Sequence, residues 1–284
     1  MKAMLIVLLG MTFLFPPPNI GTRTSQTAGL AAPQTSAQKA AMDELNEAAR
    51  YYREGNFAEA QEHAERALAL DPLSETAPIL IARTIHAQYH PEDLKETNLT
   101  KAREAIAAYK RILARNPHDE EAYTAVGNLY LALKEDELFR QWVFQRAIDP
   151  TFSAEKRAAD FVSLASRHWF CSFEITELPA NQTTVSQRSS RVTRYTKPKN
   201  LAEFKKAQDC ADHGLAFIDS AIALNPASEA AWVFKMNLLR EMSKLAEMDR
   251  KLALKDRYDK QAVVARRTTE ELAKKRQNSS ATKP

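Results

Sequence analysis

The chain has 284 residues, a formal net charge of +4 and a hydrophobic fraction of 44%. This apolar fraction excludes a chain that is disordered throughout, and the low glycine count of 6, together with abundant Ala, Leu, Glu, Lys and Arg, favours helices. Basic residues alternate with acidic ones at helical spacing, which is typical of a solvated helix face and argues against a nucleic-acid partner.

The first segment of the chain has the pattern of a secretory signal peptide. Lys2 precedes the apolar run Ala3–Phe15, which is shorter than the about 20 residues that a transmembrane helix needs. Gly29, Leu30 and Ala31 offer a small-residue cleavage site. We therefore expect residues 1–31 to be a signal peptide, and the protein to be exported to the periplasm or cell envelope. The alternative is an uncleaved anchor, and membrane contact is then expected only through this segment.

Residues 32–39 are predicted to be a flexible linker, because the stretch before Ala40 contains almost no large apolar side chain that could offset its ordering entropy. Residues 41–72 then have the spacing of two helices joined by a short turn at Gly55. Tyr51 lies on the first helix, and Pro72 ends the second. The second helix carries one small and apolar stripe formed by Phe57, Ala60, Ala64 and Ala67.

This pattern resembles the tetratricopeptide repeat (TPR), a helix–turn–helix unit of about 34 residues with small and aromatic residues at these places. Further copies follow around residues 75–117, 119–150 and 154–224, of which the second of these three matches well, and a fifth begins at Glu229 and continues into a long terminal helix. The resemblance implies an all-α fold, a right-handed α-solenoid of about five TPR-like helix pairs over residues 40–276. We expect residues 277–284 to be a disordered tail. The alternative is an unrelated helical bundle.

The fourth pair is interrupted by a large insertion, at about residues 172–200, between helices expected at 154–170 and 201–224. Phe173, Ile175 and Thr176 could pair with Val192, Thr193 and Tyr195 as a β-hairpin, and a disordered basic loop is the alternative. The insertion and its flanking segments are also similar to exported bacterial repeat proteins of unassigned function.

The chain has 2 cysteines, Cys171 and Cys210, one on each side of this insertion. The resemblance implies that the two helices carrying them pack antiparallel, and export would let a bond between them persist. We therefore predict a Cys171–Cys210 disulfide. The alternative is that Cys210 is a small buried residue and that Cys171 is an unrelated neighbour of Trp169.

No phosphate-binding loop, nucleophile elbow or Cys-x-x-Cys motif occurs, so we expect no catalysis and no cofactor. His86 and His90 are four residues apart, but Pro91 follows and no third ligand is evident. We interpret them as loop histidines rather than metal ligands. Asn98 and Asn181 begin Asn-x-Thr patterns, which matter only in a eukaryotic secretory pathway.

The resemblance implies partner binding on the concave face, lined mainly by the first helix of each pair. In one version of the repeat, basic and amide side chains there grip a peptide's terminal carboxylate. The corresponding positions here hold Leu45 and Ala49 in the first pair and Glu121, Thr124 and Ala125 in the third, and only Asn128 matches.

A carboxylate clamp is therefore not expected. The candidate partner-binding residues are Asn46, Asn128 and Asn237, because amides can hold a peptide backbone. The predicted function is a non-catalytic exported scaffold that binds a protein or peptide. The alternative is a small-ligand or glycan-binding accessory protein of the cell envelope.

Overall fold

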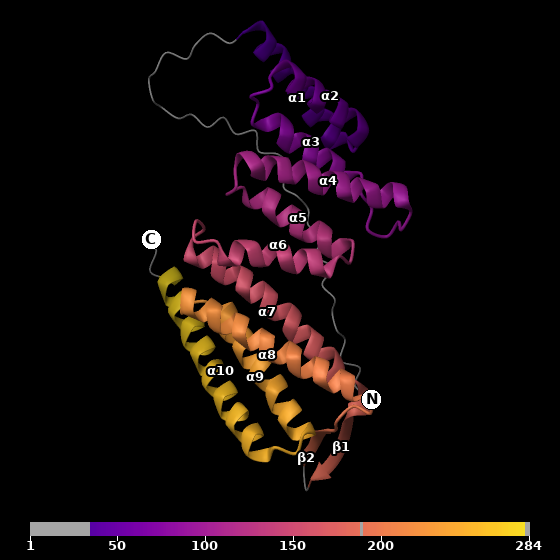
Figure 1. The fold of residues 1–284 in the computed structure, drawn as a ribbon. Helices are drawn as coiled ribbons and strands as arrows, with labels where there is room; N and C mark the ends of the chain where they lie inside the picture. The colour runs from indigo at the N-terminus through magenta and orange to yellow at the C-terminus, as the bar shows by residue number, and fades with distance from the viewer. Residues whose placement is uncertain (1–34, 188–189, 282–284) are drawn as a thin grey trace. The chain divides into compact units, whose positions relative to one another are not determined.

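The computed structural model describes residues 35–187 and 190–281, and these residues are mostly helical (Figure 1). The chain divides into two compact units, with the boundary between Lys134 and Glu135. The helices of the N-terminal unit are α1 Ser36–Glu54, α2 Phe57–Leu70, α3 Thr76–Ala87, α4 Glu96–Arg115 and α5 Glu120–Ala132. Those of the C-terminal unit are α6 Asp136–Ile148, α7 Ala154–Thr176, α8 Leu201–Leu224, α9 Glu229–Met248 and α10 Leu252–Ala281.

In the N-terminal unit, each helix packs on the one that follows it, and α1 also contacts α3 (Figure 1). This succession of antiparallel helices, in which the first helices of neighbouring pairs meet, is the packing of a TPR-type α-solenoid. Small side chains permit the close approach, since Ala48, Ala60, Ala64 and Ala67 are all fully buried. Of the stripe predicted on the second helix, the three alanines are therefore core, and Phe57 is half-buried.

The beginning of α1 is set by a capping box. The Thr35 side chain accepts a hydrogen bond from the Gln38 backbone N–H, and the Gln38 side chain accepts one from the Thr35 N–H. The helix therefore starts four residues earlier than Ala40, and residues 36–39 are helical rather than linker. At the other end, Gly55 has a φ of 81°, the left-handed conformation that ends helices at low cost.

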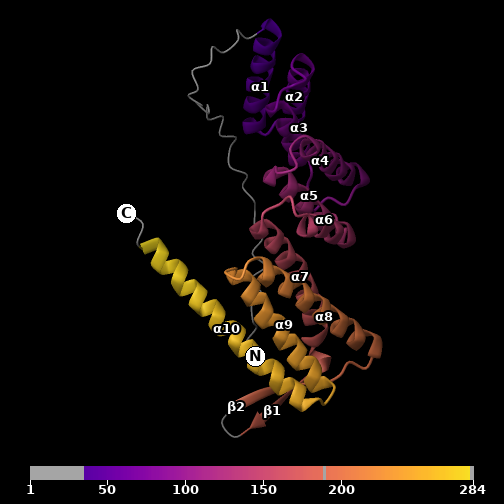
Figure 2. The same cartoon turned by 60° about the vertical axis from the view of Figure 1, so that its left-hand side comes forward.

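In the C-terminal unit, α6 to α10 also pack in succession, and α7 additionally contacts α9. The long helices α7, α8 and α9 pack on one another (Figure 2), and α10 packs on α9. One core cluster joins Phe204, Ala207 and Ala211 of α8 to Leu245 and Met248 of α9. The third predicted helix pair is divided by the unit boundary, because α5 belongs to one unit and α6 to the other.

The insertion in the fourth pair forms a short 3-10 helix, Pro179–Asn181, and an antiparallel hairpin of β1 Gln182–Gln187 and β2 Ser190–Tyr195. Gln182 pairs with Tyr195, and Val185 pairs with Val192. The hairpin was therefore predicted with the correct second strand and the wrong first one. Phe173, Ile175 and Thr176 instead extend α7, because Ile175 packs on the α8–α9 cluster and the Thr176 hydroxyl is buried against α9.

The hairpin is attached to α9 and to the turn that follows it, next to which both strands lie in Figures 1 and 2. Arg194 of β2 pairs with Glu247 at 3.4 Å, and Lys197 pairs with Asp249 at 2.5 Å. The Tyr195 hydroxyl donates to Glu177, just beyond α7, at 3.1 Å. These contacts give the two-stranded ribbon the support that it lacks on its own.

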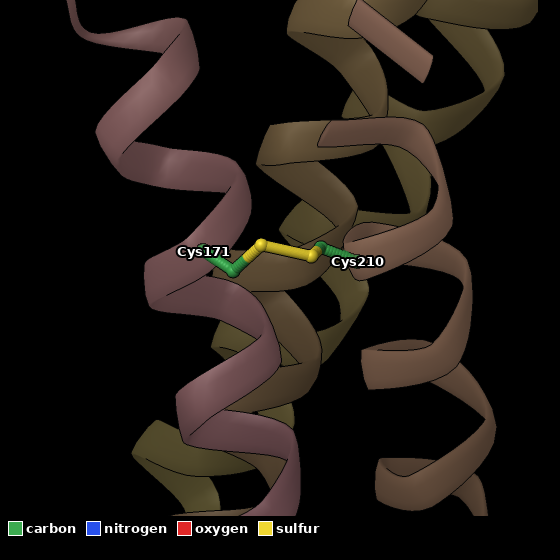
Figure 3. Close-up of a disulfide and its surroundings, with 2 residues drawn as sticks. All are labelled: Cys171 and Cys210. Carbon is green, nitrogen blue, oxygen red and sulfur yellow. A yellow bond between two sulfur atoms is a disulfide. The ribbon is translucent and has the colours of Figure 1, made fainter. Parts of the chain in front are cut away.

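Cys171 of α7 and Cys210 of α8 form a disulfide with a Cα–Cα distance of 6.0 Å (Figure 3). Cys171 lies more than one turn before the end of α7 rather than at its end, because the helix continues to Thr176. The bond joins the two helices on either side of the insertion, at a sequence separation of 39 residues.

The last helix, α10, extends to Ala281, so residues 277–281 of the expected tail are helical, and residues 282–284 lie outside the described part of the chain. The expected signal peptide, residues 1–31, also lies outside it. Among the described helices, none has the combination of length and apolar character required to cross a membrane.

Candidate partner-binding groove

Two hollows lie along the first helices of the N-terminal unit. The first, which we term the aliphatic hollow, has a volume of about 120 Å³ and lies between α1 and α3. Its walls are mainly apolar, and three polar side chains, Asn46, Thr76 and Arg83, line it as well. The lining residues are Met42, Leu45, Asn46, Ala49, Thr76, Ile79, Leu80 and Arg83. Because Met42 is 47% exposed, this hollow is accessible to a partner.

The second, which we term the tyrosine hollow, has a volume of about 450 Å³ and is formed by helices α1, α3, α4 and α5 and the loop after α3. Its lining residues are Tyr52, Arg83, His86, Ala87, Tyr89, Pro91, Tyr109, Asn128, Leu129 and Ala132. Three tyrosines make it suitable for a ring or another flat apolar group.

Arg83 lines both hollows, which makes them neighbours along α3. Its guanidinium donates two hydrogen bonds to Glu121 of α5, one of them from Nε to Oε1 at 2.5 Å. This hydrogen bonding to Glu121 raises the pKa of Arg83. The ion pair neutralises the charge at the junction of the hollows, and its two-point geometry fixes both side chains.

His86 closes part of the tyrosine hollow. Its Nδ1 lies 3.3 Å from the Tyr109 hydroxyl, and the two rings meet edge to face. Burial lowers the pKa of His86 and raises that of Tyr109, so both groups are uncharged at neutral pH. His86 belongs to the last turn of α3 and is therefore not a loop histidine, whereas His90 does lie in the following loop.

The predicted amides are distributed over both units. Asn46 lines the aliphatic hollow and Asn128 lines the tyrosine hollow, and both are exposed. Within the described part of the chain, neither amide has a hydrogen-bond partner in the protein, which leaves both available to a ligand. Asn237 lies on α9 of the C-terminal unit, is half-buried and lines neither hollow.

Sequence reasoning did not identify Arg83, which lines both hollows, or the tyrosines of the tyrosine hollow as groove residues. Arg83 lies one helical turn after Ile79 and Leu80, on the face of α3 that the repeat pattern turns toward the groove, and this spacing was a usable signal. Tyr89 lies in an insertion, where the repeat pattern has no corresponding position, so no sequence signal placed it.

A larger hollow of about 620 Å³ lies at the turns that join α2 to α3 and α4 to α5. Two of its polar side chains serve the turn between α4 and α5, since Asp119 accepts a hydrogen bond from the Ala122 N–H and Asn116 accepts one from the His118 N–H. We therefore regard the two first-helix hollows, rather than this one, as the candidate groove.

Other polar groups singled out in the sequence have structural roles. The Asn98 side chain is buried and bonds to the backbone of His90 and Asp93. Asn181 is buried and donates to the Ile175 carbonyl. Neither is accessible for glycosylation as folded. Over residues 35–187 and 190–281, no three His, Cys, Asp or Glu side chains gather in a way that could hold a metal ion.

The comparisons with known proteins gave matches only among solved structures. No family model and no curated protein matches the chain. PilF of Pseudomonas aeruginosa is similar, with 14% identity over 81% of this chain and 78% of that one, at a TM-score of 0.34. MamA has 11% sequence identity over 82% of this chain and 95% of its own, at a TM-score of 0.36. A tetratricopeptide repeat protein of Parabacteroides merdae has 12% sequence identity over 82% of this chain and 93% of its own, at a TM-score of 0.35. Because these TM-scores are low, the assignment of TPR-like helix pairs rests on the packing described above.

Proposed function

We propose that the chain is a non-catalytic, exported scaffold that binds a protein or peptide partner along the first-helix face of its N-terminal unit. The observation that carries this proposal is the pair of adjoining hollows that share Arg83, each with an exposed amide, Asn46 or Asn128. Amides can donate to and accept from a peptide backbone at the same time. Asn237 is a third candidate contact, on α9.

Export is supported by two independent features. Lys2 and the apolar run Ala3–Phe15 have the pattern of a signal peptide, which would end near Ala31. The Cys171–Cys210 disulfide is of the kind that persists in oxidising compartments such as the periplasm. Both features support our proposal that the mature protein is located in the cell envelope.

The proposal is tested by capture of partners from envelope extracts on the immobilised full chain and on variants. We expect Asn46→Arg combined with Asn128→Arg to abolish capture, because two long charged side chains would fill the hollows. Thr100→Arg, an exposed position on α4, adds the same side chain outside both hollows and should leave capture unchanged.

Equal capture by all three forms would overturn the groove assignment. Asn237→Arg alone tests α9 in the same assay, and retained capture would remove Asn237 from the site.

A glycan array screened in parallel covers the alternative function. Glycan binding that the double variant abolishes, without any protein captured, would establish the accessory role instead.

A further inference from the structure

The two hollows differ in size and chemistry, and this difference bears on the kind of peptide that they fit. This inference rests on the proposed function, since it describes the ligand of the same groove. The aliphatic hollow is the smaller, at about 120 Å³, and its walls are chiefly Met, Leu, Ile and Ala side chains. The tyrosine hollow is larger, at about 450 Å³, and Tyr52, Tyr89 and Tyr109 line it. An aliphatic side chain suits the first, and an aromatic or proline ring suits the second.

The spacing of the hollows along α3 limits how the two anchors are arranged in a ligand. The aliphatic hollow uses Thr76, Ile79, Leu80 and Arg83 of this helix, and the tyrosine hollow uses Arg83, His86 and Ala87. Their centres are thus about six residues apart, or about 9 Å at about 1.5 Å per residue. In an extended peptide, side chains on one face recur every second residue, about 7 Å apart. Anchors at positions i and i+2 therefore match the groove best.

The ion pair at the junction of the hollows disfavours a charged side chain on the face of the ligand that meets the groove. Arg83 and Glu121 already satisfy each other, and both side chains are largely shielded, with exposed fractions of 22% and 37%. An acidic ligand would have to displace Glu121 from Arg83 and leave that carboxylate without its partner. A basic ligand would have to displace Arg83 from Glu121 and leave that guanidinium without its partner. Both exchanges give up a two-point, charge-assisted contact.

We propose that the groove binds an extended, uncharged peptide segment with an aliphatic residue and a ring-bearing residue two positions apart. The two anchor side chains lie on either side of the Arg83–Glu121 pair and carry no charge, and the side chain between them points away from the groove. The peptide backbone is held by the amides of Asn46 and Asn128. A terminal carboxylate is not a recognition element, because the only cation that lines both hollows in the described chain is already paired with Glu121.

The test is selection from a random peptide library displayed on phage, with the immobilised full chain as bait and the Asn46→Arg/Asn128→Arg variant as counter-selection. We expect the retained peptides to share the aliphatic–x–ring pattern, without Asp or Glu at either anchor position and with no restriction at x. Their affinity should change less than about threefold when the salt concentration is raised tenfold, because no net charge is neutralised on binding.

Two variants connect the selected pattern to the structure. Met42→Asp places a charge at the exposed rim of the aliphatic hollow and should weaken a selected peptide at least tenfold. It should not weaken further a peptide whose aliphatic anchor is replaced by alanine. Glu121→Gln releases Arg83, and should raise the affinity of peptides with Glu in place of one anchor about tenfold while leaving neutral peptides within twofold. Circular dichroism confirms that each variant is folded.

The outcomes separate the two proposals. Peptides that are rich in Asp or Glu, or that require a free carboxyl terminus and are lost on Arg83→Gln, would show that the groove binds peptides and that the inferred chemistry is wrong. Peptides retained equally by the chain and by the double-arginine variant would overturn the groove as a peptide site, and with it the inference.

Discussion

His168 is a histidine held in its neutral form inside the C-terminal unit. It belongs to α7 and faces α8, and its ring centroid lies 5.6 Å from that of His213 and 5.4 Å from that of Phe217. Burial, followed by the charges of His213 and Arg140, lowers its pKa from 6.5 to about 4. The unfolded chain therefore binds more protons between these two pH values. Stability is fully present above pH 6.5 and decreases as the pH falls toward 4.

We expect the free energy of unfolding to fall by up to about 1.4 kcal/mol per pH unit in this window because of His168. The measurement is urea unfolding between pH 4 and 7, followed by tryptophan fluorescence. All 3 tryptophans lie in the C-terminal unit, at Trp142, Trp169 and Trp232. The His168→Gln variant should show a smaller slope, and an unchanged slope would contradict the assignment.

A second buried group, Glu241 of α9, supports the attachment of the hairpin. Its side chain is 2% exposed, accepts from the Thr176 hydroxyl at 2.6 Å and pairs with Lys244 at 2.7 Å. Lys244 also reaches Glu177 at 2.5 Å. We expect Glu241→Ala to lower the free energy of unfolding by about 3 kcal/mol, because it leaves a buried cation with one partner fewer.

The control for this change is Asp256→Ala, which breaks the exposed pair with Lys260 on α10. Exposed ion pairs contribute little, so this variant should unfold at the same urea concentration as the parent chain. If Glu241→Ala lowers the free energy of unfolding no more than the control does, the buried network is not needed for stability.

At the residue scale, the sequence was informative where one residue type has few roles. The two cysteines beside an insertion predicted the pair that the structure joins. Of the three amides predicted to contact a partner, Asn46 and Asn128 each line a hollow and Asn237 lines neither, and their contact with a partner stays a prediction. Arg83 and Glu121 were not predicted as a pair, because their contact joins α3 to α5 and a charge pattern within one helix carries no record of it.

Among the elements, α8 packs closely on its neighbours through a glycine. A Cβ built on Gly214 would lie 2.5 Å from Leu238 Cδ2 of α9 and 3.2 Å from His168 Cβ of α7. Leu238 is fully buried, so it has no open space to move into. Overpacking typically costs about 1–3 kcal/mol, and the better helix propensity of alanine returns about 1.

We therefore expect Gly214→Ala to destabilise the chain by about 1 kcal/mol in urea unfolding. In a Leu238→Ala background the obstructing methyl groups are gone, and the same change should be neutral or stabilising. A double-mutant cycle measures this reversal of sign. Destabilisation of equal size in both backgrounds would exclude steric contact with Leu238 as the cause.

The disulfide is the other element-scale constraint, because it links α7 to α8 across the insertion. In the chain-entropy model, closing a loop with a sequence separation of 39 stabilises the folded state by about 4 kcal/mol. We expect Cys171→Ser combined with Cys210→Ser to lose up to this amount in urea unfolding. Addition of a reductant should reproduce the loss in the parent chain and have no effect on the double variant.

At this scale, helix existence was predictable and helix ends were less so. The repeat spacing predicted α8 with its observed ends, Leu201 and Leu224, because a side-chain cap at Asn200 and Pro226 mark them in the sequence. The end of α7 was missed by six residues. Phe173, Ile175 and Thr176 favour a strand in isolation, but the contact of Thr176 with Glu241 keeps this segment helical.

For the whole molecule, the location of the protein and the state of its cysteines are linked. A disulfide forms and persists in an oxidising compartment, whereas reducing systems keep cytosolic thiols free. The basic start and apolar run of residues 1–15 provide the export signal that we propose, and the segment up to about Ala31 would be removed or retained as a tether.

We therefore expect the full gene, expressed in a bacterial host, to give an envelope protein in which Cys171 and Cys210 are bonded. A matched form that lacks residues 2–31 should stay in the cytosol with two free thiols and unfold at a lower urea concentration. Fractionation, followed by mass spectrometry of protein alkylated without reductant, measures location and thiol state in one sample. A full-length chain that is wholly cytosolic, with Met1 intact, would contradict export. Free thiols in an envelope fraction would instead show that export alone does not form the bond, and would separate the two claims.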